Sequence, residues 1–259
     1  MSQLEAALQA LEALAPKRLA ADWDNVGLLI RGTRECASIL CAIDCTTAVV
    51  DEVIERDADM LIAYHPPIFG GIKRLDGGTA RNTSILRLVR AGVHVYSPHT
   101  ALDAQVGGVN DWLLEAFGGC SDVAPVEATE AHAATGQGRV ATLDTPAALA
   151  DLAVMLARHL AVPHVQRVGD ATQRVRRVAV CPGAGGSLLR DLSEVDAVVT
   201  GEMRHHDQLA LMERGVGVLL AGHTETERGY LPIVASKLRA ALPDCSVAVA
   251  EQDRSPVSW

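Results

Sequence analysis

Residues 38–65 read SILCAIDCTTAVVDEVIERDADMLIAYH, and this stretch decides the fold class. A strand-like run at 38–45 is followed at 47–56 by apolar residues at helical spacing. A second apolar run, at 60–64, then ends on His65. A strand, a helix and another strand in this order predict a crossover connection between parallel strands, which is typical of an α/β protein.

The same alternation continues along the rest of the chain. Further strands are predicted at 93–96, 139–143, 174–180, 197–200, 216–221 and 246–250, and helices at 79–91, 109–117, 146–160, 206–212 and 227–241. Residues 118–138 are polar and weakly patterned, which favours a lobe boundary there. We therefore expect two similar α/β lobes with mixed, largely parallel sheets, at 1–125 and 126–259. The two form one integrated unit, and the final segment of the chain can pack back on the first lobe.

The amino-acid composition limits the kinds of molecule that the protein is expected to bind. The 259 residues are 49% hydrophobic and 21% charged, so a full core is feasible. The formal net charge is −9 and aromatic residues make up only 3%. A negative field repels nucleic-acid phosphates and anionic lipids, and few aromatics are present to stack on bases. We expect no nucleic-acid or membrane partner, although a bound metal could still attract a small phosphorylated ligand.

The first residues predict an amphipathic helix rather than a signal peptide. Ser2 and Glu5 have capping-box spacing, and no basic region precedes the apolar positions. No run of eighteen apolar residues is present, so a membrane-spanning helix is not expected. The six cysteines are scattered and predict reduced thiols. Together these features predict a cytoplasmic protein.

Three predicted strands end on histidine. His65 follows the strand at 60–64, His99 follows the strand at 93–96, and His223 follows the strand at 216–221. Ligands of open α/β sheets bind at the carboxyl ends of the strands. His99 is followed four residues later by Asp103, and His223 is followed at the same spacing by Glu227.

That spacing has a use in metal binding. Residues i and i+4 share one face of a helix, so an imidazole and a carboxylate can meet at one point. Imidazole with carboxylate suits Zn, Fe, Mn or Co, and a carboxylate can bridge two ions about 3.5–4 Å apart. A single pair of this kind is common by chance and is then an ordinary polar pair. Three strand-end histidines, two of them with carboxylates, favour a two-metal site.

Five segments together resemble a known family. They are DWDNVGLLI (22–30), AYHPPIFGGIKRL (63–75), VYSPHTALDAQVGGVNDWL (95–113), VVTGEMRHHDQLA (198–210) and GHTETERGYL (222–231). Their sequence and order are similar to the YbgI/Nif-three-like family, whose members are often labelled GTP cyclohydrolase I type two. YHPP and SPHT resemble its eukaryotic-type variant. The short stretch between the two halves implies that the domain inserted in some relatives is missing.

The resemblance implies two divalent metal ions per chain, Zn, Fe or Mn, in a cleft between the lobes. By motif, the implied ligands are His65, Asp103, His223 and Glu227, with Asp103 and Glu227 as bridges. His99 has two alternative roles, as a further ligand or as an acid or base beside the ions. The resemblance also implies a homo-oligomer, a hexamer built as a trimer of dimers, with a small-molecule substrate.

Tyr64 departs from the pattern of bacterial relatives, which have a second histidine at this position. A phenol has an ordinary pKa of about 10 and is a poorer ligand at neutral pH. We therefore expect one ion to bind tightly and the other loosely. Tyr64 and His99 are the residues that we expect to move protons.

Two further features are candidates for substrate contacts. CPGAGGS (181–187) is a glycine-rich turn, and the N–H groups of Gly183 and Gly185 could hold an anion; otherwise it is only a tight turn. It lacks the lysine of a P-loop. By resemblance His206 points toward the metals as a substrate or supporting group. The alternative for His206 is a solvated or capping histidine.

Two functions fit these residues. The first is a metal-dependent hydrolase of a nucleotide-like or small phosphorylated substrate, with metal-activated water as the nucleophile at the dinuclear site. The guanine-ring substrate suggested by the family label is not adopted. The second is a non-catalytic metal-binding or adaptor protein, which would need the same ligands.

Overall fold

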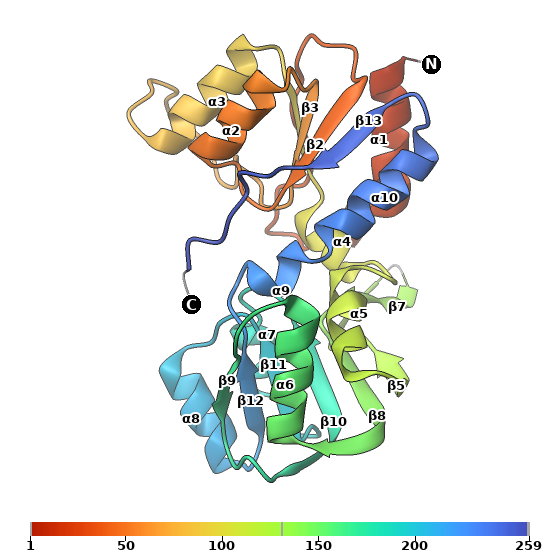
Figure 1. The fold of residues 1–259 in the computed structure, drawn as a ribbon, viewed down its shortest axis with the longest axis vertical. Coiled ribbons are helices and arrows are strands. Elements are labelled where there is room, and N and C mark those ends of the chain that lie inside the picture. The colour runs from red at the N-terminus through yellow and green to blue at the C-terminus, as the bar shows by residue number, and fades with distance from the viewer. Residues whose placement is uncertain (1, 131, 258–259) are drawn as a thin grey trace. The chain divides into compact units, whose positions relative to one another are not determined.

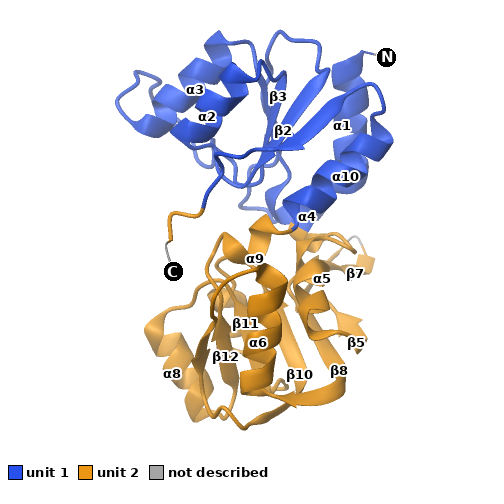
Figure 2. Ribbon diagram, viewed as in Figure 1, with its two compact units in different colours: residues 1–102, 230–254 blue, residues 103–229, 255–259 orange. Residues whose placement is uncertain are grey.

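Two structural units, coloured separately in Figure 2, make up this computed structural model, which describes residues 2–130 and 132–257. Unit 1 comprises Met1–Leu102 and Tyr230–Arg254. Unit 2 comprises Asp103–Gly229 and Ser255–Trp259. Each unit has its own β-sheet with helices packed on it (Figure 1), so the predicted α/β fold class is confirmed.

The sheet of unit 1 has the strand order β1-β4-β3-β2-β13. β4, β3, β2 and β13 pair in parallel, whereas β1 pairs antiparallel with β4. The bounds are β1 (Gly27–Ile30), β2 (Ser38–Ala42), β3 (Met60–Ala63), β4 (His94–Ser97) and β13 (Ser246–Val249). All four residues of β3 are buried. Burial on both faces of a parallel sheet explains the continuous apolar run in the sequence.

The helices of unit 1 cover both faces of this sheet. They are α1 (Gln3–Leu14), α2 (Thr47–Glu55), α3 (Ala80–Arg90) and α10 (Leu231–Ala241), with a 3-10 turn η1 (Lys17–Leu19). α2 packs beside α3 on one side, and α1 packs beside α10 on the other (Figure 1). The predicted capping box of α1 is confirmed, because the Ser2 and Glu5 side chains each accept the other residue's backbone N–H.

The sheet of unit 2 has the strand order β5-β8-β10-β11-β12-β9. Only β10, β11 and β12 pair in parallel, and both edges are antiparallel. The bounds are β5 (Cys120–Ala124), β8 (Arg139–Ala148), β9 (Gln166–Val168), β10 (Arg174–Cys181), β11 (Ala197–Thr200) and β12 (Gly217–Leu220). β6 (Glu127–Thr129) and β7 (His132–Gln137) form a separate two-stranded sheet.

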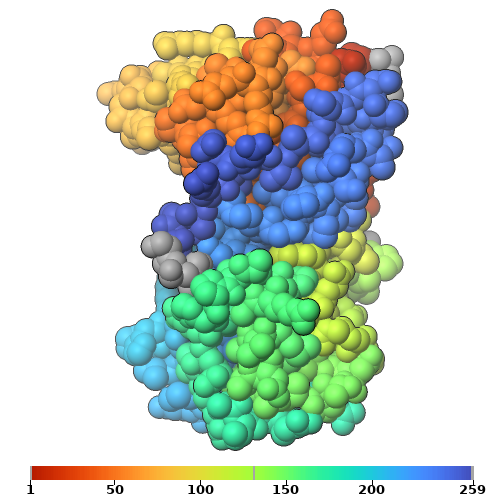
Figure 3. Space-filling view, viewed as in Figure 1, coloured from red at the N-terminus to blue at the C-terminus, as the bar shows by residue number. Residues whose placement is uncertain are grey.

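The helices of unit 2 are short, apart from α6. They are α5 (Val109–Leu114), η2 (Glu115–Phe117), α6 (Leu149–Leu160), α7 (Gly186–Leu189), α8 (His205–Glu213) and α9 (Glu225–Arg228). In the view that Figure 1 and Figure 3 share, α6 lies in front of the sheet of unit 2. α4 (His99–Ala104) runs across the division, because its residues from Asp103 onward belong to unit 2.

Residues 118–138 differ from the sequence expectation, because they contain three strands rather than an unpatterned link. The side chains of β5 are almost all exposed, so no alternation of apolar and polar residues marks it. β5 pairs with β8 in the sheet of unit 2, whose first segment, Asp103–Gly229, includes these residues. The expected helix at 146 begins at Leu149, because residues 144–148 continue β8.

After Gly229 the chain returns to unit 1 for residues 230–254. β13 pairs in parallel with β2, and α10 packs against both strands. No helix within residues 2–130 and 132–257 is long and apolar enough to cross a membrane.

Candidate functional site

His65 lies directly beyond β3, and a carboxylate orients its ring. The backbone N–H of His65 donates to Ile43 O at 2.9 Å, which continues the pairing of β3 with β2. The ring Nδ1 lies 2.9 Å from Asp44 Oδ1. An ionised carboxylate can only accept a hydrogen bond, so in the neutral ring Nδ1 carries the proton and Nε2 has the lone pair.

Asp44 is held in place from the end of the chain. The Asp253 carboxylate accepts the N–H of Ile43 at 2.7 Å and that of Asp44 at 3.4 Å. Nearby, the Glu52 carboxylate accepts the N–H groups of residues 251–252 at 3.0 and 2.8 Å. Asp253 is 7% exposed, so water competes little for its oxygens. The segment after β13 therefore fixes the loop that carries Asp44.

His99 begins α4 with a φ of 25°, which residues other than glycine rarely adopt. Its Nδ1 lies 2.9 Å from both oxygens of Asp24, whose side chain is fully buried. Asp24 also accepts the N–H and the hydroxyl of Thr100. Burial raises the pKa of Asp24, but the hydrogen bonds from His99 and Thr100 outweigh it and hold that pKa below its ordinary value. Ionised Asp24 thus selects the same tautomer in His99 as Asp44 does in His65.

Tyr64 joins these two histidines in a cluster of rings. Its ring centroid lies 5.2 Å from that of His65 and 5.7 Å from that of His99, and the two histidine rings lie 5.4 Å apart. Tyr64 is only 3% exposed. The ring therefore packs both histidines in unit 1, while its expected role in proton transfer stays a prediction.

His223 and Glu227 form the corresponding pair in unit 2. They lie on either side of the start of α9, and His223 Nε2 is 3.5 Å from Glu227 Oε1. His223 Nδ1 lies 2.9 Å from Glu202 Oε1. If Nδ1 donates to Glu202, the neutral ring directs a lone pair at the carboxylate of Glu227. Two electron-rich atoms facing each other at this distance suit a cation between them.

At Gly183 the backbone of the glycine-rich turn lies close to the side chains of His223 and Glu227. Its φ is +62°, and a Cβ at this position would lie 2.3 Å from Glu227 Oε1 and 3.1 Å from His223 Nε2. No other residue type fits here without displacing the carboxylate. The glycine-rich turn after β10 therefore forms a wall of the His223–Glu227 pair.

The N–H groups of Gly183 and Gly185 in that turn donate to side chains of unit 2, and their expected role in holding an anion stays a prediction. Gly183 donates to Thr226 Oγ1 at 2.9 Å, and Gly185 donates to Thr200 Oγ1 at 3.0 Å. α7, which follows the turn, has only four residues, and its N-terminus therefore supplies little helix dipole. The turn shapes the site through its close approach.

Asp103 and Glu227 act on a common neighbour in unit 2. Burial raises the pKa of the Cys181 thiol, and the negative charges of Asp103 and Glu227 raise it further. Both carboxylates therefore lie within electrostatic range of one thiol at the end of β10. Asp103 also lies one helical turn after His99 in α4, as the motif spacing predicts.

A family model described as Duf34/NIF3 (NGG1p interacting factor 3) matches residues 2–256. The chain belongs to the Duf34/NIF3 family. The resemblance noted in the sequence is thereby confirmed.

Individual relatives agree with this assignment. The chain is 35% identical to "Protein NIF3 homolog" of Schizosaccharomyces pombe, over 96% of this chain and 95% of that protein. It is 30% identical to "GTP cyclohydrolase 1 type 2 homolog" of Clostridium acetobutylicum, over 90% of this chain and 88% of that protein. The crystal structure of hypothetical protein SA1388 from Staphylococcus aureus shares the fold, with a TM-score of 0.86, 24% identity, and coverage of 100% of this chain and 99% of that one.

In this Duf34/NIF3 chain, sequence reasoning missed the three carboxylates that orient the histidines. Asp44 follows β2 and Glu202 follows β11, so both lie at the carboxyl ends of parallel strands. Asp24 precedes β1, which runs antiparallel to β4, and thus lies at the edge where β4 ends. The rule that identified the histidines points to the strand ends that carry Asp44 and Glu202, but not to Asp24, which precedes an antiparallel strand.

His206 is a surface residue of unit 2. It is exposed on α8, and its ring contact is with His205, at 5.5 Å between centroids. The role expected for His206, as a substrate or supporting group, stays a prediction.

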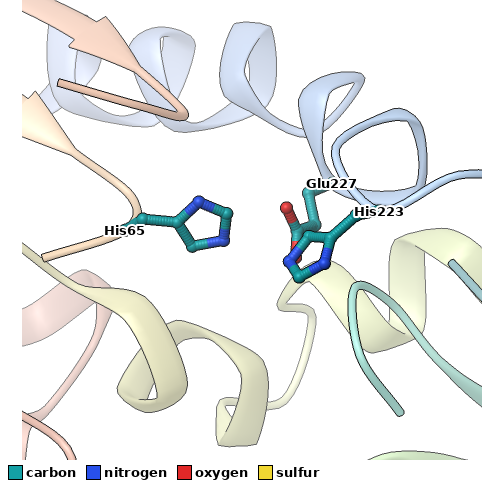
Figure 4. A group of neighbouring side chains, drawn as sticks. All are labelled: His65, His223 and Glu227. Carbon is teal, nitrogen blue, oxygen red and sulfur yellow. The ribbon is translucent and has the colours of Figure 1, made fainter. Parts of the chain in front are cut away.

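Three side chains each offer one atom to a metal ion: His223 and Glu227 in unit 2, and His65 in unit 1 (Figure 4). His65 extends from the segment after β3, and the other two extend from the chain around α9 (Figure 4). Imidazole nitrogen and carboxylate oxygen suit Zn, Fe or Mn. A carboxylate on the second nitrogen of a histidine is the usual support of a metal ligand. The residues present therefore fit a divalent metal.

Proposed function

We propose that this chain is a divalent-metal-dependent hydrolase of nucleotide-like or other small phosphorylated molecules. The observation that carries the proposal is the pairing of His223 Nε2 with Glu227 Oε1 at 3.5 Å, while Glu202 occupies Nδ1. A neutral imidazole in this tautomer offers a lone pair and an ionised carboxylate offers a negative charge, and together they are donors that suit a divalent cation.

The proposed ligand set adds His65 from unit 1 and Asp103 from unit 2. His65 has the same tautomer as His223, because Asp44 accepts from its Nδ1. Asp103 and Glu227 are the carboxylates that can bridge two ions. Because Tyr64 stands where a second histidine could bind, we expect the second ion to be held more weakly than the first.

In the proposed reaction the metal ions and the protein side chains have separate roles. When bound, divalent ions would act as Lewis acids and acidify a water molecule at the site. His99 is placed to take a proton at Nε2, because Asp24 accepts from Nδ1 and fixes the tautomer. The low pKa of Asp24 keeps this carboxylate ionised over the physiological range. The alternative role of His99, as a further ligand, uses the same nitrogen.

The substrate class rests on two supports. One relative carries the name "GTP cyclohydrolase 1 type 2 homolog", and hydrolysis of a nucleotide is what that name describes. The chain's formal charge of −9 disfavours long polyanions, whereas metal ions at a local site attract a single phosphorylated molecule.

A substrate screen tests the proposal. Purified protein is loaded separately with Mn, Fe, Co or Zn and offered a panel of nucleotides and phosphoesters, and bound metal is measured by elemental analysis. We expect turnover in at least one metal form and its loss in the double variant His223→Ala/Glu227→Ala. The matched control is His205→Ala, which removes an exposed histidine of unit 2 and should leave turnover unchanged.

Three outcomes separate the alternatives. Turnover that survives His223→Ala/Glu227→Ala contradicts the proposal. Stoichiometric metal binding without turnover of any substrate favours the non-catalytic metal-binding or adaptor role. Two tightly held equivalents of metal per chain would contradict the expected difference between the ions.

The hexamer and the cytoplasmic location stay predictions. Light scattering that gives a particle of the chain mass, 27.4 kDa, would contradict a homo-oligomer. Cell fractionation tests the location.

A further inference from the structure

Trp23 and Phe69 are exposed aromatic residues in a chain that has few aromatics. The sequence contains three Trp, three Tyr and two Phe. Trp23 is 65% exposed and Phe69 is 47% exposed. The other Trp, Tyr and Phe residues in the described ranges are buried: Tyr64, Tyr96, Trp112, Phe117 and Tyr230. Among the described residues, the exposed aromatic rings are therefore those of Trp23 and Phe69.

The two exposed rings lie together in unit 1. Their centroids are 5.9 Å apart and their planes are tilted by 54°. Each also meets the ring of His99 nearly edge-on, at 6.2 Å from Trp23 and 6.4 Å from Phe69. Packing around His99 alone does not account for them, because about half or more of each side chain still faces water.

The backbone around these rings is held by specific hydrogen bonds. Asn25 Nδ2 donates to Ile68 O at 2.5 Å, which ties the segment of Trp23 to the segment of Phe69. Arg81 Nε donates to Pro67 O at 2.5 Å, two residues before Phe69. The pair is therefore preorganised, which lowers the entropy cost of binding a ligand.

The size and geometry of the pair suit one planar ring. Two side chains present on the order of 250 Å² of apolar surface, whereas a stable protein interface buries about 800 Å² on each partner. Aromatic rings prefer offset stacking or edge-to-face contact. A planar ring stacked on Trp23 would meet the tilted Phe69 in the second geometry, and thus gain both contacts at once. A saturated ring or an alkyl chain gains only from the buried area.

We propose that Trp23 and Phe69 form a stacking site for a planar heteroaromatic ring, such as a purine base, beside His99. This inference deepens the proposed function, because it names the part of the substrate that unit 1 recognises. Recognition is through the flat face of the ring and requires no phosphate and no metal.

Equilibrium dialysis tests the stacking site. Guanosine and adenosine, which carry no phosphate, are the probes, with ribose and inorganic phosphate as ligands that lack the ring. The full chain is used after EDTA treatment and again after loading with Mn. We expect both nucleosides to bind with or without Mn, and Trp23→Leu to weaken their binding by about tenfold or more.

Two variants control for packing and for loss of apolar surface. Trp23→Phe keeps an aromatic face and should bind nucleosides within about threefold of the original chain. Val154→Ala removes a 69% exposed apolar side chain from α6 and should leave nucleoside binding unchanged. Circular dichroism of each variant establishes that it is folded. A Phe69→Leu variant provides a second test if Trp23→Leu does not fold.

Several results would overturn the stacking site. One is equal nucleoside binding by the original chain, Trp23→Leu and Phe69→Leu. Another is no nucleoside binding at millimolar concentration. A third is binding of ribose with the same dependence on Trp23. Loss of oligomer in Trp23→Leu, without nucleoside binding by the original chain, would assign this surface to a second copy of the chain instead.

The outcomes distinguish this inference from the proposed hydrolase. Nucleoside binding without any metal-dependent turnover retains the stacking site and contradicts the hydrolase. Metal-dependent turnover of purine nucleotides that is indifferent to Trp23→Leu and Phe69→Leu, without nucleoside binding, retains the hydrolase and contradicts the stacking site.

Discussion

The histidines of the two units are supported in the same way but in different surroundings. Nδ1 of His99 in unit 1 and Nδ1 of His223 in unit 2 each lie 2.9 Å from a carboxylate oxygen. The supporting Asp24 side chain is 0% exposed, whereas that of Glu202 is 62% exposed. Equal distances therefore do not imply equal energies, because water and salt screen the exposed pair and not the buried one.

In unit 2, backbone packing rather than a buried carboxylate holds the histidine in place. The close approach of Gly183 to His223 and Glu227 confines the pair through backbone sterics rather than through a buried charge. His65 in unit 1 is intermediate, because its partner Asp44 is 38% exposed but is anchored by the buried Asp253. The comparison predicts that the effect of removing a support follows its burial and not its hydrogen-bond length.

The largest effect is expected for Asp24→Asn. The change keeps the shape but removes the charge that accepts from His99 and Thr100, and it places an amide NH₂ among buried donors. We expect the free energy of unfolding to fall by about 3 kcal/mol, measured by urea denaturation. Asp57→Asn is the control: its side chain is 85% exposed beside Arg34, and it should lose less than about 1 kcal/mol. Similar losses of unfolding free energy in Asp24→Asn and Asp57→Asn would contradict the prediction that the effect follows burial.

The same variant has a predicted pH dependence. Because the folded-state pKa of Asp24 is lowered, the unfolded chain takes up a proton at this residue first as the pH falls. The stability that Asp24 contributes is therefore present above its ordinary pKa of about 3.9 and is lost as the pH falls through the lowered value. The difference in unfolding free energy between the original chain and Asp24→Asn should shrink below about pH 4. A difference that grows on acidification would contradict the assignment.

The second prediction concerns the glycine wall of unit 2. Gly183→Ala places a Cβ on Glu227 Oε1 at a φ of +62°, so it adds a clash to backbone strain. We expect a loss of about 2 kcal/mol in stability and at least a tenfold loss in metal affinity, on the order of that for a displaced supporting group. Gly215→Ala is a matched control, because its φ is +77° and its Cβ would meet no atom within 4 Å. Equal metal affinity in both variants would show that Gly183 acts only through strain.

Much of the fold could be predicted, because burial leaves a record in the sequence. β3 is buried throughout and appears as an apolar run that ends on His65. β5 is exposed, pairs at a sheet edge and leaves no such record, so the sequence indicated no strand at these residues. Edge strands depend on backbone pairing with a distant segment, which no local pattern encodes.

The candidate ligands could be predicted for a different reason. His223 and Glu227 are four residues apart, and one helical turn brings them together. Their supports come from elsewhere in the chain: Glu202 is 21 residues from His223, and Asp24 is 75 residues from His99. Such pairs depend on strand order, and the order β1-β4-β3-β2 was not derivable from residue spacing.

The third prediction tests whether Asp253 supports His65 through Asp44. Asp253→Asn weakens the bonds from the N–H groups of Ile43 and Asp44, and should cost about 1.5 kcal/mol in unfolding free energy. We expect metal affinity to fall severalfold, because Asp44 then orients His65 less well. Glu52→Gln is the matched control: it loosens residues 251–252 without touching the Asp44 loop. Metal titrations that fall equally in both variants would reduce Asp253 to a general stabiliser.

The smallest effect is expected for Glu202→Gln. Glu202 is 62% exposed, so its bond to His223 is screened, and stability should change by less than about 0.5 kcal/mol. Metal affinity should fall by less than about threefold at low salt, and the difference should vanish at high salt as screening removes the remaining attraction. The measurement is the same metal titration at two ionic strengths. If Glu202→Gln instead weakens metal binding as much as Gly183→Ala and does so at both salt concentrations, then the tautomer of His223 matters more than burial, because orientation of a ring nitrogen does not depend on screening.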